Sequence, residues 1–341
     1  MWQGLGSMTN GLKAVLAMLV MSIAVVSTAR AEPLRIRMSY VAPLSNWAPF
    51  FVAKKDLARH WGRSYNMEAV RYQGTPEMIA ALANGELEIA SLAYSTIGIA
   101  IANAGISDLR IISDEFRDGV PGHFSTQFFV RKDSGIQKIA DLKGKVLATN
   151  QVGGGVDIAM KAGLRKHGLL DKRDYTVIEA PIPVMPQVLA EKKADLVMAV
   201  MPFALNPTLN EVGFPLFNLT EGLGTSQFLM FAARKATIDK NRAAMVDLME
   251  DMIRIERWYL DPKNQEEVRK VASDLVKQPP ERFGWLFTGK DYYRDPNMAP
   301  DLTALQRNVD LTAEMGFISS RIDVKQHSDL SLIEEAVKRL Q

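Results

Sequence analysis

Strand-like and helix-like segments alternate along this chain in two similar series, and this alternation restricts the possible fold more than any other feature. In the first series, short apolar runs predict strands, and apolar residues at helical spacing predict the helices between them. Thr75 is placed as the N-cap of the second helix, with Pro76 at its first position. The predicted elements are a strand at 34–40, a helix at 46–62, a strand at 67–73, and a helix, turn and strand within 74–94.

The second series begins near Asp141 and repeats the same plan. Six positions match the first series at an offset of 107 residues, as Pro76 matches Pro183, and the spacing leaves open whether the halves arose by duplication. Strands that alternate with helices predict parallel βαβ units, so we expect two α/β halves and no (β/α)₈ barrel. The predicted elements are a strand at 144–150, a helix at 156–169, a strand at 175–181, and a helix, turn and strand within 183–200.

Two extended segments connect the halves. The runs Gln127–Arg131 and Gln227–Ala233 are β-rich, and each follows a turn that contains Gly, Ser and Thr. We interpret the segments 115–135 and 214–235, which contain these runs and turns, as two crossovers between domains. The remaining residues, 239–341, are mostly helical in pattern, and we expect this block to return to the first half.

The N-terminal segment has the pattern of a secretory signal peptide. Lys13 precedes an apolar run at 14–26, and a small-x-small site follows that ends at Ala31. This run is shorter than the roughly 20 residues that span a membrane, and an uncleaved anchor is the alternative. Cleavage after Ala31 leaves equal numbers of acidic and basic residues, which argues against nucleic acid as a partner. We therefore expect an exported, soluble protein.

Three consecutive glycines, Gly153–Gly155, join a predicted strand to a predicted helix. A dinucleotide fingerprint requires a further glycine where Ile158 stands, and a P-loop requires Gly-Lys-Ser/Thr where Val156 and Asp157 follow. Two interpretations remain. The free N–H groups of the helix start form a seat for an anion or polar group, or Asp157 simply satisfies the turn.

Other polar and aromatic residues also follow predicted strands, where open α/β sheets place their ligands. Hydroxyls and amides there would orient a ligand and aromatic rings would form walls, although each residue singly also suits a core or capping role. The candidate ligand-binding residues are Ser45, Asn46, Trp47, Tyr94, Ser95, Thr96, Gly154, Gly155, Val156, Asp157, Pro202, Phe203, Thr225 and Ser226.

The motifs of catalysis and metal binding are missing from the sequence. Cysteine is absent, which removes disulfides, thiolate nucleophiles and zinc–thiolate sites. The four histidines lack HxH or HxxxH spacing, and there is no Gly-x-Ser-x-Gly elbow. We predict no metal, no cofactor and no enzymatic activity.

The chain resembles the periplasmic solute-binding proteins of ABC importers, in the nitrate/sulfonate/taurine group that also includes thiamine-precursor binders. The resemblance rests on ALANGELEIASLAYS (81–95), VRKDSGIQKIADLKGKVLATN (130–150), KHGLL (166–170) and VLAEKKADLVMAVMPF (188–203). The chain departs from the group in having Gly153–Gly155 where Ser or Thr is common, and Lys192 or Lys193 where a turn glycine is usual.

This resemblance implies a type II-like, two-lobed α/β protein in which two crossovers form a hinge and each lobe is a mixed, mainly parallel sheet flanked by helices. The implied function is to capture a small anionic solute of the sulfonate, taurine, nitrate or aromatic carboxylate type in the periplasm and to deliver it to a membrane permease, as a monomer. A sensor without an importer and an extracytoplasmic enzyme are the alternatives. The expected bounds are 1–31 for the signal peptide, 32–125 with 228–341 for lobe 1, and 126–227 for lobe 2.

Overall fold

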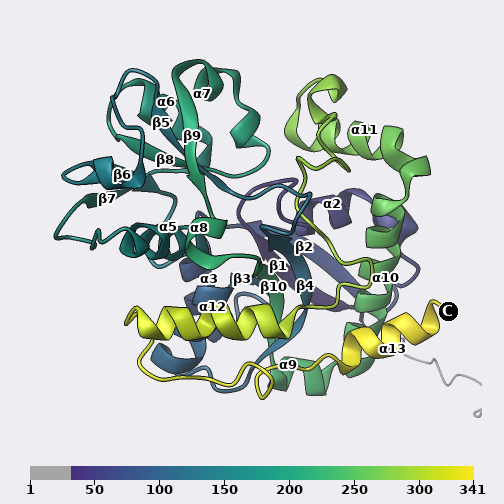
Figure 1. Ribbon diagram of the computed structural model, residues 1–341. Coiled ribbons are helices and arrows are strands. Elements are labelled where there is room, and N and C mark those ends of the chain that lie inside the picture. Colours follow the sequence, from purple (N-terminus) through teal and green to yellow (C-terminus); the bar gives the residue numbers. More distant parts are fainter. Residues whose placement is uncertain (1–31) are drawn as a thin grey trace, which may run out of the picture. The chain divides into compact units, whose positions relative to one another are not determined.

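Two sets of strands organise the computed structural model, which describes residues 32–341 (Figure 1). The predicted signal peptide therefore lies outside the described residues. We call the first set sheet 1. Strand β1 pairs in parallel with β2, and an isolated bridge from Met38 to Ile89 joins β1 to the neighbourhood of β3, which gives the order β2-β1-β3-β10-β4. The bounds are β1 (Leu34–Tyr40), β2 (Tyr65–Arg71), β3 (Ala90–Ala93), β4 (Leu109–Asp118) and β10 (Ser226–Arg234).

The second set, sheet 2, repeats this arrangement in the order β7-β6-β8-β5-β9. Strand β5 runs antiparallel to both of its neighbours, as β10 does in sheet 1. Strands β3 and β8 are buried along their whole length, so neither alternates between apolar and exposed polar residues; β8 is apolar throughout and β3 contains only Ser91 as a polar residue. The bounds are β5 (Gln127–Arg131), β6 (Val146–Thr149), β7 (Thr176–Glu179), β8 (Leu196–Ala199) and β9 (Gly213–Asn218).

The chain passes between the two sheets twice, as the sequence predicts. Residues 119–126 lead from β4 into β5, and residues 219–225 lead from β9 back into β10. The two passages touch, because the Thr225 hydroxyl donates to the carbonyl of Gly119 at 2.9 Å and Leu219 N–H donates to the carbonyl of Thr126 at 2.8 Å. Strand β9 is an element that the sequence analysis did not predict.

Short helices cover the sheets at the predicted places, with two corrections. Thr75 is the first residue of α3 and Gly74 occupies the N-cap, so the predicted cap is wrong by one position. The helix expected at 46–62 spans only Ala48–Ala53 and is followed by a 3-10 turn at Lys55–Leu57. Farther along, the N–H groups of Arg59 and His60 donate to Asp251 and not to a helix. The bounds are α2 (Ala48–Ala53), α3 (Thr75–Ala83), α4 (Tyr94–Gly98), α5 (Gly155–Lys166), α6 (Met185–Ala190), α7 (Pro207–Val212) and α8 (Thr220–Leu223).

The C-terminal block is largely helical and packs on elements of sheet 1. Helix α10 lies beside α13, α11 contacts α2, and α12 contacts α4 and β10 (Figure 1). Between α11 and α12, the segment around Tyr292 is not helical and hydrogen-bonds to both sides of the first passage, at Arg117 and Phe124. The bounds are α9 (Lys235–Lys240), α10 (Arg242–Leu260), α11 (Gln265–Val276), α12 (Leu302–Glu314) and α13 (Ser331–Arg339). In the described part of the chain, no helix is both long and apolar enough to cross a membrane.

Candidate binding site

A cavity of about 50 Å³ lies between sheet 1 and sheet 2, where strands of both sheets end. Its polar lining comes from the loop after β1, from the start of α3 and from the start of α5. Its apolar lining includes three aromatic rings, of which Phe116 stacks on Tyr292 with centroids 4.2 Å apart. The residues with most bearing on ligand binding are Ser45, Asn46, Thr75, Phe116, Asn150, Gly154, Gly155, Val156, Phe228 and Tyr292.

Five of the candidate residues line this cavity, namely Ser45, Asn46, Gly154, Gly155 and Val156. The three glycines have different roles. Gly153 has a φ of +80°, which suits glycine, and Gly154 is the N-cap of α5. A Cβ on Gly155 would lie 2.7 Å from the Cβ of Ala93 and 3.1 Å from the ring of Phe228. The loop therefore brings α5 into direct contact with sheet 1.

Asp157 does not line the cavity. Its carboxylate is fully buried, pairs with the Lys161 ammonium at 2.9 Å and accepts the N–H of Gly153 at 2.9 Å. Burial raises the pKa of the Asp157 carboxyl, and the charge of Lys161 opposes this shift. Asp157 thus satisfies the N–H of Gly153 in its own turn, whereas no side chain caps the start of α5.

The aromatic and hydroxyl residues at 94–96 also lie outside the cavity lining, but two of them touch the glycine loop. The Tyr94 hydroxyl donates to the carbonyl of Gly155 at 2.9 Å, and the Ser95 hydroxyl donates to the carbonyl of Gly153 at 3.3 Å. Thr96 donates to the carbonyl of Ala93 within its own turn. Tyr94 and Ser95 thus connect α4, beside sheet 1, to the start of α5, beside sheet 2.

The other candidates are placed elsewhere. Trp47 is buried in the core, stacked on Phe50 with centroids 5.0 Å apart. Pro202 and Phe203 line a separate groove of about 460 Å³. Thr225 bonds across the two passages, and Ser226 is buried at the start of β10.

Several residues of the cavity are not among the residues predicted from the sequence. Thr75 was interpreted only as a cap, although its position at a helix start was a usable signal. Phe228 is in a predicted strand, and Tyr292 is far along the chain in a block with no motif. Nothing in the local sequence indicates that either ring reaches the cavity.

A buried network fixes the loop after β1. The carboxylate of Glu115 accepts hydrogen bonds from the N–H of Trp47 at 2.8 Å and from the Asn46 amide at 3.1 Å. Arg294 donates to the carbonyls of Ser45 at 2.8 Å and Leu44 at 3.2 Å. Burial raises the pKa of Glu115, and its hydrogen bonds oppose this shift. The loop is thus held by groups that do not line the cavity.

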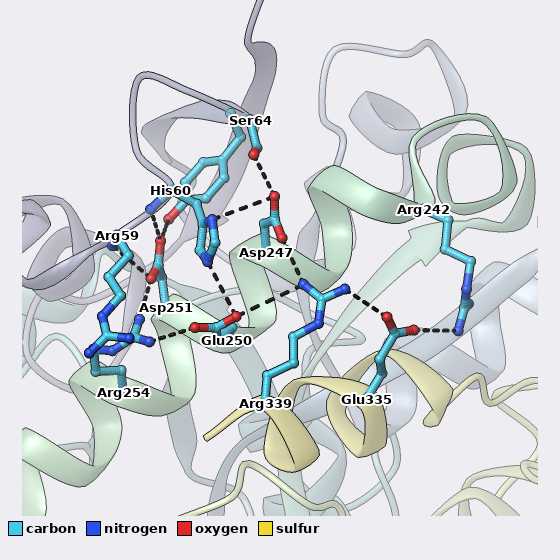
Figure 2. Close-up of polar contacts among 11 residues, drawn as sticks. Arg59, His60, Ser64, Arg242, Asp247, Glu250, Asp251, Arg254, Glu335 and Arg339 are labelled. Atoms are coloured by element: carbon cyan, nitrogen blue, oxygen red, sulfur yellow. Dashed lines mark hydrogen bonds and ion pairs between the residues drawn. The ribbon is translucent and has the colours of Figure 1, made fainter. Parts of the chain in front are cut away.

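One histidine lies against two acidic residues in the described structure. His60 approaches Glu250 at 3.2 Å and Asp247 at 3.6 Å (Figure 2). Asp247 also pairs with Arg339 at 2.8 Å, and Glu250 pairs with Arg254 at 2.5 Å. Because arginines already neutralise both carboxylates, this cluster ties the segment before β2 and the C-terminal helix to α10, and it is a poor metal site.

The paired strand orders, the two passages and the cavity between the sheets define the two-domain periplasmic binding-protein fold. Solved structures of this fold include the alkanesulfonate-binding protein SsuA of Xanthomonas axonopodis pv. citri with bound MOPS, at 19% identity and a TM-score of 0.70 over 88% of this chain and 99% of that one. The nitrate-binding protein NrtA of Synechocystis PCC 6803 is similar at 16% identity and a TM-score of 0.69 over 91% and 90%. The desulfurization enzyme DSZB is similar at 12% identity and 0.65 over 90% and 100%.

The chain belongs to the NMT1-like family, whose sequence model matches residues 29–273. No curated protein matches it by sequence. Its structural relatives thus include both binding proteins and an enzyme.

Proposed function

We propose that this protein is the extracytoplasmic solute-binding component of an ABC importer, which captures a small anionic solute by hinge closure and delivers it to a membrane permease. The observation that carries the proposal is the cavity between the two sheets, lined from both sides beside two chain passages. Such a cavity can be opened and closed by bending at the passages, without covalent chemistry. Relatives named as sulfonate- and nitrate-binding proteins support the same role.

The start of α5 would hold the polar end of the solute. Its N-cap, Gly154, has no side chain to satisfy the first N–H groups of the helix, and these groups carry a partial positive charge. An anion seated there would replace the missing cap. Aromatic rings on the opposite wall would contact the rest of the solute.

The proposed lobes are residues 32–125 with 228–341, and residues 126–227. The first bound falls inside the passage at 119–126, and the second falls within β10, two residues after the passage at 219–225. Each proposed lobe contains one five-strand arrangement, and bending near Gly119 and Gly224, both at positive φ, would open the cavity. We propose that the protein acts as a monomer.

The likeness to DSZB makes an extracytoplasmic enzyme the second candidate. The cavity lining contains the hydroxyls of Ser45 and Thr75, but within the described residues no histidine, carboxylate or lysine lines it beside them. A hydroxyl nucleophile requires a neighbouring base. The binding function therefore agrees better with the lining.

A direct test purifies the protein without refolding, identifies any retained ligand by native mass spectrometry, and measures thermal stabilisation by sulfonates, carboxylates, nitrate and taurine. A true ligand at about 100 times its Kd should add about 2.7 kcal/mol to the free energy of unfolding. Loss of uptake of that ligand in a deletion strain would support the importer over a sensor. Turnover of the ligand by the purified protein, or no stabilisation by any compound, would contradict the proposal.

We also propose export to the periplasm with cleavage after Ala31. The intact mass of the protein from the periplasmic fraction should then correspond to a chain that begins at Glu32. A membrane-bound, full-length chain would instead support the uncleaved anchor.

A further inference from the structure

Two helix starts meet at the cavity, one from each side. Helix α3 begins after Gly74 and α5 begins after Gly154, and neither N-cap supplies a side-chain acceptor. A Cβ on Gly154 would lie 3.8 Å from Cδ of Pro76 and 4.0 Å from the hydroxyl of Thr75, so the two starts face each other across a space of about one methyl group. The partial positive charge of both helix starts favours an anion between them. The carboxylates in the first turns act against it, but that of Asp157 is paired with Lys161 and that of Glu77 accepts hydrogen bonds from Gln73 and Gln151.

A buried hydroxyl at this point has no partner. Thr75 is 6% exposed and lines the cavity, and its Oγ1 makes no hydrogen bond within residues 32–341. Leaving such a group unpaired is unfavourable, since the hydroxyl has lost its bonds to water. An oxygen of a bound ligand would satisfy it.

The remainder of the lining carries no charged side chain among the described residues. The acid on the same loop, Asp157, is paired with Lys161 and lies outside the lining. An ammonium group on a bound ligand would therefore be buried without a counter-charge. A second carboxylate would meet no cation in this lining, only apolar side chains and neutral polar ones such as Asn46 and Asn150. Both arrangements are strongly unfavourable.

The size of the cavity sets a further limit. A single water requires roughly 10–15 Å³ of such space. The cavity of about 50 Å³ thus has room for a few heavy atoms. An adjoining cavity of about 320 Å³ shares Val41 and Ile182 with it and includes Arg71 and Glu77, so a longer anion would reach charged groups only there.

From these observations we infer that the solute is a compact monoanion with an uncharged aliphatic body, whose oxyanion sits between the starts of α3 and α5 and accepts a hydrogen bond from Thr75. This inference rests on the proposed function and narrows its ligand class to short carboxylates and sulfonates. It removes taurine and other zwitterions from that class. Thr75 would bind the anion from the side of sheet 1 by donating its hydroxyl hydrogen.

The experiment compares probes that differ only at the far end. Propionate, β-alanine and succinate form one set, ethanesulfonate and taurine form another, and benzoate tests size. Calorimetry should show that propionate or ethanesulfonate binds at least about tenfold tighter than its amino analogue, because an unpaired ammonium would be buried. If taurine, β-alanine, succinate or benzoate binds as tightly as the short neutral-bodied probes, the inference is wrong while the proposed binding function stands. If no probe binds but a compound of the wider panel stabilises the protein, the inference is wrong and the binding function stands; if neither occurs, both are contradicted.

Variants at Thr75 test the anion contact. Thr75→Val keeps the shape but removes the donor, and should weaken binding of the best probe by about tenfold. Thr75→Ser should retain most of the affinity. The matched control is Thr176→Val on the exposed strand β7, and melting temperatures without probe establish that all three variants fold. Unchanged affinity in a folded Thr75→Val variant would overturn the role of Thr75.

Discussion

The side-chain amides of Gln73 and Asn150 each donate to the main-chain carbonyl of the other residue, both at 3.0 Å. Gln73 follows β2 of sheet 1 and Asn150 follows β6 of sheet 2, so this reciprocal pair connects the two sides of the cavity. Beside it, Gln151 donates to Glu77 at 3.1 Å. These direct bonds describe a closed arrangement.

Removing one of these amides should favour the open form. Gln73→Ala loses the bond to the carbonyl of Asn150, which contributes about 0.5–1.5 kcal/mol. We expect ligand affinity to fall about twofold to tenfold, mostly through faster dissociation measured by stopped flow. The control is Gln187→Ala, whose amide bonds to exposed Glu191. Equal effects of both changes would show that the pair does not stabilise closure.

Gly155 should tolerate no side chain in the closed form. A methyl group there would lie 2.7 Å from the Cβ of Ala93, closer than two carbon atoms can approach. Gly155→Ala should therefore weaken ligand binding by more than about tenfold and raise the radius of gyration in small-angle scattering.

Gly163 in the same helix provides the control for this change. A Cβ at that position would make ordinary contacts of 3.5 Å or more. Gly163→Ala should leave binding unchanged and raise stability by up to about 1 kcal/mol, because alanine favours helix. A Gly155→Ala variant that binds like the wild type would show that α5 does not approach β3 this closely.

Arg294 is the cation that the buried acids require. It lies fully buried near Glu115, Glu256 and Asp291 while it holds the loop after β1. Arg294→Met should lower the free energy of unfolding by about 3–5 kcal/mol in urea denaturation, because it leaves buried carboxylates without a counter-charge. Arg35→Met, at an exposed pair with Glu68, should change it by at most about 1 kcal/mol. Similar losses in both variants would contradict this role.

Stability should fall as the pH rises toward the alkaline range. Burial raises the pKa of Glu256 from 4.5 to about 8, although the Arg294 guanidinium opposes the shift. The folded protein thus keeps a proton that the unfolded chain has released, and the free energy of unfolding decreases between about pH 5 and about pH 8. Glu256→Gln should flatten this dependence in denaturation curves across that range, whereas exposed Glu266→Gln should leave it unchanged. An unaltered slope in Glu256→Gln would rule out this source.

The spacing of apolar residues predicted the two α/β halves, because the buried face of a strand or helix requires apolar residues at a characteristic local spacing. Strand β5 was predicted at its observed bounds, and the glycine loop was placed correctly at the start of α5. The positive φ of +62° at Lys192 likewise agrees with the turn where the group usually has glycine.

Local spacing did not predict backbone hydrogen bonds to residues that are distant in the sequence. The helix expected through residue 62 does not reach Arg59 and His60, whose N–H groups donate to the distant Asp251. His60 looked isolated in the sequence, yet α10 brings two carboxylates to it.

The sequence by itself determined the fold class, the repeated succession of strands and helices along the chain, and the loop that carries Gly154. Only the tertiary structure decided which side chains surround the cavity, since Thr75 and Tyr292 come from opposite ends of the chain. The structure also shows that Trp47 and Asp157, which were expected in the binding site, are buried in the core. The physical reason is that periodicity fixes which face of an element is buried, whereas the residues that meet across two sheets depend on how the sheets are placed relative to each other.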